Sequence, residues 1–197
     1  MLPVAMKITP IISQLRSYCP SFAGRVAGAL ELAALLDDAA PLMALPAAYV
    51  VPTREDPQSP MTTAPYLQDL EEKFDVVVAL APGDERGQAV ADRLHDLRAE
   101  LWRALLGWSP PDCDPVEYDG GALLMLNRGR VIWRFGFTAM SVIGGIRGAG
   151  DAPATWHDVE RDGLADLLRV HIDVDNGPVP DGEIDQQLQI TLPAAST

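Results

Sequence analysis

The sequence predicts an α+β domain built on a mixed, mainly antiparallel β-sheet, flanked by a long amphipathic helix and shorter N-terminal helices. Three observations predict it. Residues 74–81 are apolar on both sides, so a strand formed here must be covered on both faces and belongs mid-sheet. Apolar residues then recur at three- and four-residue steps, as in a helix with one apolar side. Residues 130–142 alternate as a strand with one buried face does.

Two short helices are expected before the central strand. Thr9 can cap the first of them and Pro10 suits its first turn, while Cys19 and Pro20 end it. Residues 29–37 are rich in alanine and leucine at helical spacing, which predicts the second.

The long helix follows a turn at Pro82 and Gly83 and spans about 23 residues. Acids in its first turn suit the positive end of the helix dipole, and Gly107 ends it as a C-terminal cap. Its apolar positions are Val90, Leu94, Leu97, Leu101 and Leu105.

Further strands are predicted from β-branched and aromatic residues between turn signals. They lie at 47–51, 116–118, 122–126, 130–142, 167–174 and 184–192. Prolines and polar residues predict a loop or excursion at 53–63, and the glycine pair after Asp119 predicts a turn.

A β-hairpin is expected from the strands on either side of Asn127-Arg128-Gly129. Every second residue of the second strand of this hairpin is expected to face the core: Val131, Trp133, Phe135, Phe137 and Ala139. The alternate residues of this strand, which include Arg130 and Arg134, are expected to face water or a partner. Glycine dominates 144–153, which predicts a main domain at 1–143 and an acidic extension with two strands at 144–197.

No recognisable catalytic, cofactor or metal motif occurs. The glycines between Gly144 and Gly150 lack the following helix that a dinucleotide site needs. The segment beginning at Asp173 lacks the glycine and glutamate of a calcium loop, and the three histidines have no ligand spacing. We therefore expect no enzyme, no metal and no cofactor.

Composition narrows the class of protein further. A net charge of −13 argues against a protein that binds nucleic acid by neutralising phosphates, although DNA could pass such a surface without sticking. No apolar run is long enough to span a membrane, and the start of the chain lacks signal-peptide character. We expect a soluble intracellular protein with its two cysteines reduced.

Charge is distributed unevenly along the chain. Residues 120–150 contain no acid and carry +4, so the remainder carries −17. Such a division suits a head-to-tail contact between copies, which can close into a ring. The predicted interface residues are Arg128, Arg130, Arg134, Arg147, Asp173 and Asp175. The alternative is that the arginines pair within their own chain.

Several blocks of sequence together resemble the tail terminator-like proteins of long-tailed bacteriophages and prophages. The blocks lie at 8–12, 19–28, 46–50, 84–89, 97–108, 118–121 and 127–130, within a match from about Lys7 to Thr138. None of them is a catalytic motif, so the resemblance indicates a family rather than a chemical activity.

The resemblance implies a structural virion protein, assembled in the host bacterial cytoplasm. Such proteins form a ring, typically a hexamer, on the head-proximal end of the tail tube, where they stop tube polymerisation and join the tail to the head connector. The partners would be further copies of the chain, the tail tube protein and the head-tail connector protein, with DNA passing through the channel without specific binding. Two alternatives stay open: another neck ring protein, and a small enzyme without a recognisable motif.

Overall fold

The computed structural model divides the chain into two compact units, Met1–His157 and Asp158–Thr197. The residues that it describes are 6–28, 43–63, 65–82, 88–127, 129–148, 150–165, 167–175 and 184–192. The predicted helix at 29–37 lies outside them. The α+β class is confirmed.

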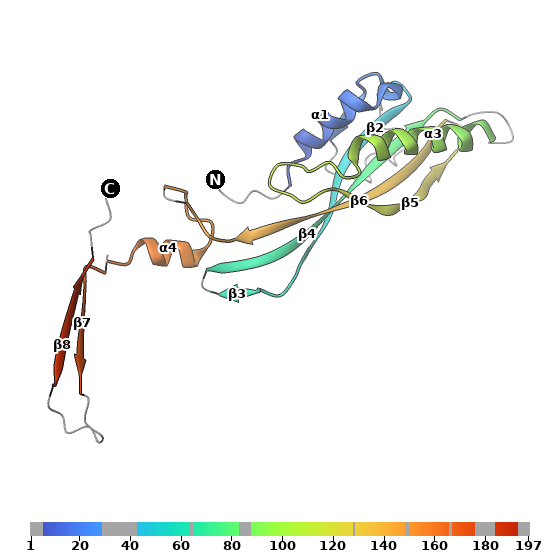
Figure 1. The fold of residues 1–197 in the computed structure, drawn as a ribbon. Coiled ribbons are helices and arrows are strands. Elements are labelled where there is room, and N and C mark those ends of the chain that lie inside the picture. Colours follow the sequence, from blue (N-terminus) through green and yellow to red (C-terminus); the bar gives the residue numbers. More distant parts are fainter. Residues whose placement is uncertain are drawn as a thin grey trace. The chain divides into compact units, whose positions relative to one another are not determined.

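The first unit is organised around a mixed sheet, which has six strands in the described part of the chain (Figure 1). Its strands are β1 (Val26–Gly28), β2 (Ala47–Pro57), β3 (Thr62–Thr63), β4 (Tyr66–Leu80), β5 (Glu117–Leu126) and β6 (Val131–Gly144). The order is β1-β2-β4-β6-β5, with β3 paired to β4, and the β1–β2 pair is parallel. The apolar run at 74–81 therefore does lie in the central strand.

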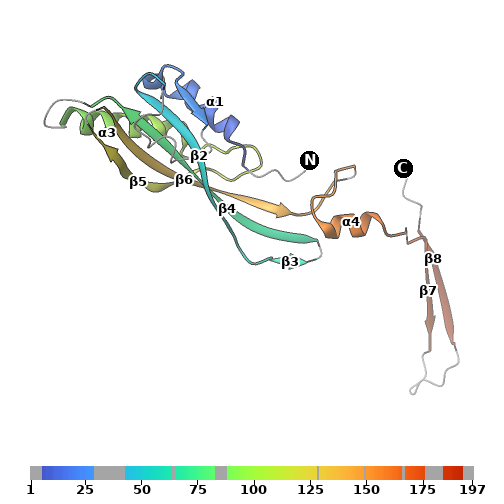
Figure 2. The same ribbon diagram turned by 180° about the vertical axis from the view of Figure 1, so that it is seen from behind.

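Two helices, α1 (Ile8–Tyr18) and α3 (Gln88–Leu105), pack against one face of the sheet, which we call the helical face (Figure 2). Phe74, Val76 and Val78 of β4 point into the core beneath these helices. A short 3-10 turn, η1 (Pro20–Phe22), adds the fully buried Phe22. The predicted core parity of β6 is confirmed: Val131, Phe135, Phe137 and Ala139 are buried and Trp133 packs against them.

The opposite face of the sheet carries a second, smaller apolar cluster. Its buried members are Ala47, Tyr49, Val51, Val77, Ala79 and Ile132. The two-sided apolar pattern of the central strand thus reflects one core on each face. Beyond these cores, β4 and β6 continue past the helices as a long antiparallel pair (Figure 1).

The predicted loop or excursion at 53–63 was right only for residues 58–61, because β2 continues through Pro52 to Pro57 and β3 occupies Thr62–Thr63. Proline lacks the N–H that a regular ladder uses, and the register of β2 shifts between Pro52 and Arg54, so the irregularity accommodates it. β1 pairs with β2 only as far as Val50, so this stretch also lies at the edge of the described sheet.

The predicted turn after Asp119 was also wrong. β5 runs unbroken from Glu117 to Leu126, and its register against β6 shifts between Tyr118 and Gly120. The positive φ of 110° at Gly120 fits a bulge at this point, because only glycine adopts it without strain. The glycine signal was real, but it marks a bulge within a strand.

The helix limits differ from the sequence predictions in two places. α1 begins at Ile8 after Lys7, so Thr9 lies inside the helix and no side chain caps the N-terminus. α3 has 18 residues, and residues 83–87 before it lie outside the described part. Its end is as predicted, since Gly107 has a φ of 77° and donates its N–H to the Val116 carbonyl.

The second unit contains a two-stranded antiparallel ribbon, β7 (Arg169–Val174) and β8 (Gln186–Thr191). Both strands had been predicted, within two residues at each end. A short helix, α4 (Trp156–Asp162), crosses the boundary between the units and was not predicted, because seven residues are too few for a clear periodic pattern.

Candidate interaction surfaces

The arginines of β6 have different surroundings. Arg134 lies on the opposite face of the sheet, and its Nη1 is 3.4 Å from Oδ2 of Asp75 in β4. The Asp75 side chain is 6% exposed, whereas that of Arg134 is 48% exposed. Arg134 therefore pairs within its own chain, which was the alternative to an interface role. About half of its side chain nevertheless remains exposed to water.

Asp75 is an acid placed where water can hardly reach it. Burial is the main cause that raises the pKa of Asp75 above its usual value, the nearby Arg134 lowers this pKa, and Asp119 raises it again. Burial thus disfavours the charged form of this carboxyl group, and the guanidinium of Arg134 partly offsets that effect.

Further charged side chains on the same face of the sheet form ion pairs and hydrogen bonds next to Asp75 and Arg134. Lys73 lies 3.4 Å from Glu71 and 3.6 Å from Asp119, and the Thr138 hydroxyl donates to Glu71 at 3.0 Å. With Arg134 and Asp75, this group carries both signs of charge. It is not the purely basic strip that the sequence of β6 alone suggested.

The remaining predicted interface residues lie in different segments of the two units. Arg130 is buried, with 9% of its surface exposed, so it does not offer a free charge to a partner. Arg147 donates from Nη1 to the backbone carbonyl of Asp151 at 2.9 Å. Asp173 lies in β7 and Asp175 directly follows it, both in the second unit, and Arg128 lies outside the described residues.

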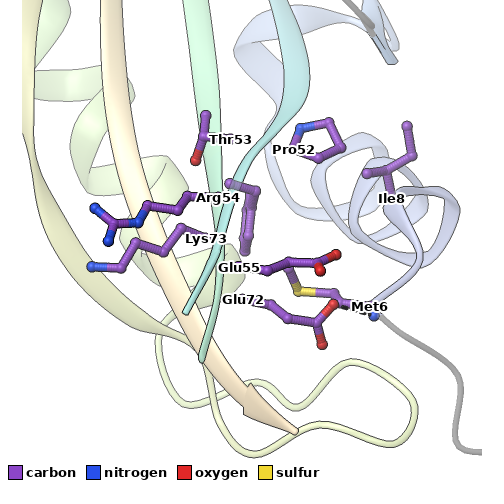
Figure 3. A pocket seen from close by; sticks show the side chains of 9 residues that line it. Met6, Ile8, Pro52, Thr53, Arg54, Glu55, Glu72 and Lys73 are labelled. Carbon is purple, nitrogen blue, oxygen red and sulfur yellow. Dashed lines mark hydrogen bonds between the residues drawn. The ribbon is translucent and has the colours of Figure 1, made fainter. Parts of the chain in front are cut away.

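A pocket of about 470 Å³ opens beside the N-terminus of α1 (Figure 3). Met6 and Ile8 form one side, and Pro52 and Phe74 contribute further apolar surface. The carboxyl groups of Glu55 and Glu72 point into the same region (Figure 3). The pocket combines an apolar lining with acidic groups, which suits an aliphatic or basic side chain of a protein partner.

Glu72 is the buried acid of this pocket, at 4% exposure. Its two carboxylate oxygens accept from the Met6 backbone N–H at 2.7 Å and the Ser141 hydroxyl at 2.6 Å. These bonds compensate for the loss of water and fasten the segment before α1 to the sheet. Glu72 therefore has a structural role.

A smaller groove of about 170 Å³ lies between α3 and β6. Leu94 and Ala91 of α3 face Trp133 and Phe135 of β6, and the groove also contains His95 and Arg98. The Arg98 guanidinium lies 4.9 Å from the centroid of the Trp102 ring and donates to His95 Nδ1 at 2.7 Å.

Exposed apolar residues continue from this groove along β5. Leu123 is 48% exposed and Leu126 is 67% exposed. β5 is the last strand of the described sheet on this side, so its outer edge has no strand partner there. We call the groove together with Leu123 and Leu126 the α3–β5 margin.

Sequence reasoning had not singled out Asp75 or Glu72. An acid inside an otherwise apolar strand was the available signal for Asp75, which stands between Phe74 and Val76. Nothing separates Glu72 from its neighbours Glu71 and Lys73, because its burial depends on strands distant in sequence.

Within the described residues, no group of three or more His, Cys, Asp or Glu side chains gathers as metal ligands. No helix there is long and apolar enough to cross a membrane. The features that stand out among the described residues are surfaces.

Comparison with known proteins identifies one relationship. The model of the phage tail terminator protein family matches residues 1–147. The match includes α1, α3 and every strand of the main sheet, and it ends before α4, β7 and β8. A search of curated proteins finds no match to the chain.

Proposed function

Because the chain belongs to the phage tail terminator family, whose members are structural tail proteins of bacteriophages, we propose that it forms a ring on the head-proximal end of the tail tube. The ring, a hexamer in this proposal, stops tube polymerisation and joins the tail to the head connector. The observation that carries the proposal is the family match over the whole main sheet and both of its helices.

Features of the first unit support a role in assembly. Among the described residues, neither the outer edge of β5 nor the outer edge of β2 after Val50 has a strand partner, so neighbouring chains can approach the sheet from either side. The pocket beside α1 and the α3–β5 margin offer apolar surface for contacts between proteins. A net charge of −13 suits a conduit through which DNA passes without specific binding.

We further propose that neighbouring subunits meet head to tail, with the acidic extension of one subunit facing the arginine-bearing segment 120–150 of the next. Arg134 can take part through the exposed half of its side chain. Arg130 is buried, so its charge is less accessible to a neighbouring subunit than that of Arg134. Reversing the charge of either arginine would thus disturb the subunit itself, so such variants are a poor test of the interface.

The experiment is in vitro tail assembly. Tail tube protein is polymerised with and without this chain, and tube lengths and end structures are measured by negative-stain electron microscopy. We expect shorter, capped tubes with a ring at one end, and light scattering should show the chain as a monomer or weak oligomer before tube is added. Tubes of unchanged length without a terminal ring would contradict the proposal, and a ring found only on the head connector would favour a different neck protein.

A further inference from the structure

The ribbon of β7 and β8 has one apolar face and one polar face. Its antiparallel register places Val170 opposite Ile190 and Ile172 opposite Leu188 on one side. Leu192 donates its N–H to the Leu168 carbonyl, which extends this apolar face by one more pair. The other side carries Arg169, His171, Asp173, Gln187, Gln189 and Thr191.

The apolar face is largely open to water within the second unit. Leu188 is 53% exposed, Ile190 is 42% exposed and Ile172 is 38% exposed. A two-stranded ribbon without a layer packed on it is marginally stable in water. The described residues of this unit provide no such layer, so the ribbon needs a surface from outside its own unit.

A second copy of the chain offers a surface of matching chemistry. The α3–β5 margin presents Leu123 and Leu126, two exposed leucines beside an apolar groove. The charged or titratable side chains that line this groove are Arg98 and His95, and no acid is among them. The second unit carries a formal charge of −7, from nine acids and two arginines. Apolar contact and charge therefore favour the same pairing.

We propose that the β7–β8 ribbon of one subunit lies with its apolar face on the α3–β5 margin of the next subunit. The inference rests on the proposed ring and names a contact that holds it together. Each chain carries one ribbon and one margin, so the contact is heterologous and repeats around a closed ring. It would also cover the open edge of β5, which otherwise remains available for unwanted strand pairing.

The test is site-specific photocrosslinking in the full-length protein. A photoreactive phenylalanine analogue replaces Leu188 on the apolar face or, as the matched control, Gln189 on the polar face of the same strand. Each chain is mixed with an equal amount of isotopically labelled chain without the analogue, and circular dichroism verifies the fold. Crosslinked peptides are identified by mass spectrometry in the concentrated protein alone and in assembled tails.

We expect position 188 to crosslink to labelled peptides from residues 88–105 or 117–133, with a yield about tenfold above position 189. Leu126→Gln in the labelled chain should lower this yield about tenfold, while Leu106→Gln, which changes another exposed leucine, should leave it unchanged. Crosslinks to the tube protein, to another phage protein, or to the same chain alone would overturn the inference, as would their absence from both samples. Tube length is measured separately, so normal termination without the crosslink would refute the ribbon contact and leave the proposed function standing.

Discussion

The pair formed by Asp75 and Arg134 gives the sharpest test of how this sheet is stabilised. The Asp75 side chain is 6% exposed, and its carboxylate lies 3.4 Å from Nη1 of Arg134. Arg134→Gln removes the positive charge and leaves the buried Asp75 carboxyl group without its charged partner. Asp75→Asn removes the negative charge and leaves an arginine that is already half in water.

The cost of Arg134→Gln follows from this geometry. Removing one partner of a fully buried ion pair costs about 3–5 kcal/mol. Here Arg134 is 48% exposed, so solvent screens the pair and we expect about 1–2 kcal/mol of lost unfolding free energy at neutral pH. Asp75→Asn should cost less than about 1 kcal/mol, because it also removes the charge that burial disfavours.

The dependence on pH has a definite sign. Burial raises the pKa of Asp75 in the folded protein above the ordinary 3.8. The contribution of this group to stability is therefore fully present below pH 3.8 and is lost as pH rises through the folded value. Arg134→Gln removes an influence that lowers this pKa, so the variant should lose more stability as the pH rises. Asp75→Asn should remove this component of the pH profile.

The assay is urea unfolding followed by circular dichroism at several pH values between 3 and 8, including the double variant. Arg54→Gln is the control: Arg54 also pairs with an acid, Asp56, but its side chain is 70% exposed, so the loss should be at most about 1 kcal/mol. An Arg134→Gln variant as stable as the parent at pH 7 would refute the reasoning. So would an Asp75→Asn variant with an unchanged pH profile.

Three further predictions concern the helical face and the long strands. Burial raises the pKa of Cys19 to about 12 and that of Cys113 to about 11, so both free thiols should react slowly with a thiol reagent at pH 8. The partly buried Cys113 should react first, and the fully buried Cys19 only on unfolding. Ser141→Ala removes a 2.6 Å bond to the buried Glu72 and should lower the unfolding free energy by about 1–3 kcal/mol in urea titrations. Gly144→Ala should cost about 2 kcal/mol or more in the same assay, because φ is +84° and the new Cβ would lie 2.0 Å from a carbonyl oxygen of β4.

The main features of the first unit could be predicted from the sequence because they depend on local periodicity. The apolar residues of 74–81 fill both sides of a strand, which requires a central position whatever the neighbouring strands are. The parity of β6 follows from Trp133, Phe135 and Phe137, whose burial fixes the direction of every other side chain in the strand.

The features that escaped prediction depend on pairing between strands distant in sequence. The placement of Arg134 on the opposite face was predicted, but its partner Asp75 is set by the register of β4 against β6, which no local pattern contains. Pro52 marked the end of a strand by its chemistry, yet a shift of register absorbs it. The glycine after Asp119 indicated an unusual backbone conformation. That this conformation is a bulge within a strand becomes clear only from the pairing of β5 with β6 on both sides of it.

The two units differ in where their stability can come from, and this bears on the order of assembly. The first unit buries a core on each face of its sheet, so it can fold before it meets a partner. The second unit exposes most of its large apolar residues, so the proposed contact with a neighbour would supply the burial that its ribbon lacks. A surface that binds only the folded ribbon stabilises it by mass action. In the proposed ring, subunits would therefore bind the tube through their first units, and the ribbons would become fully ordered only as adjacent positions are filled.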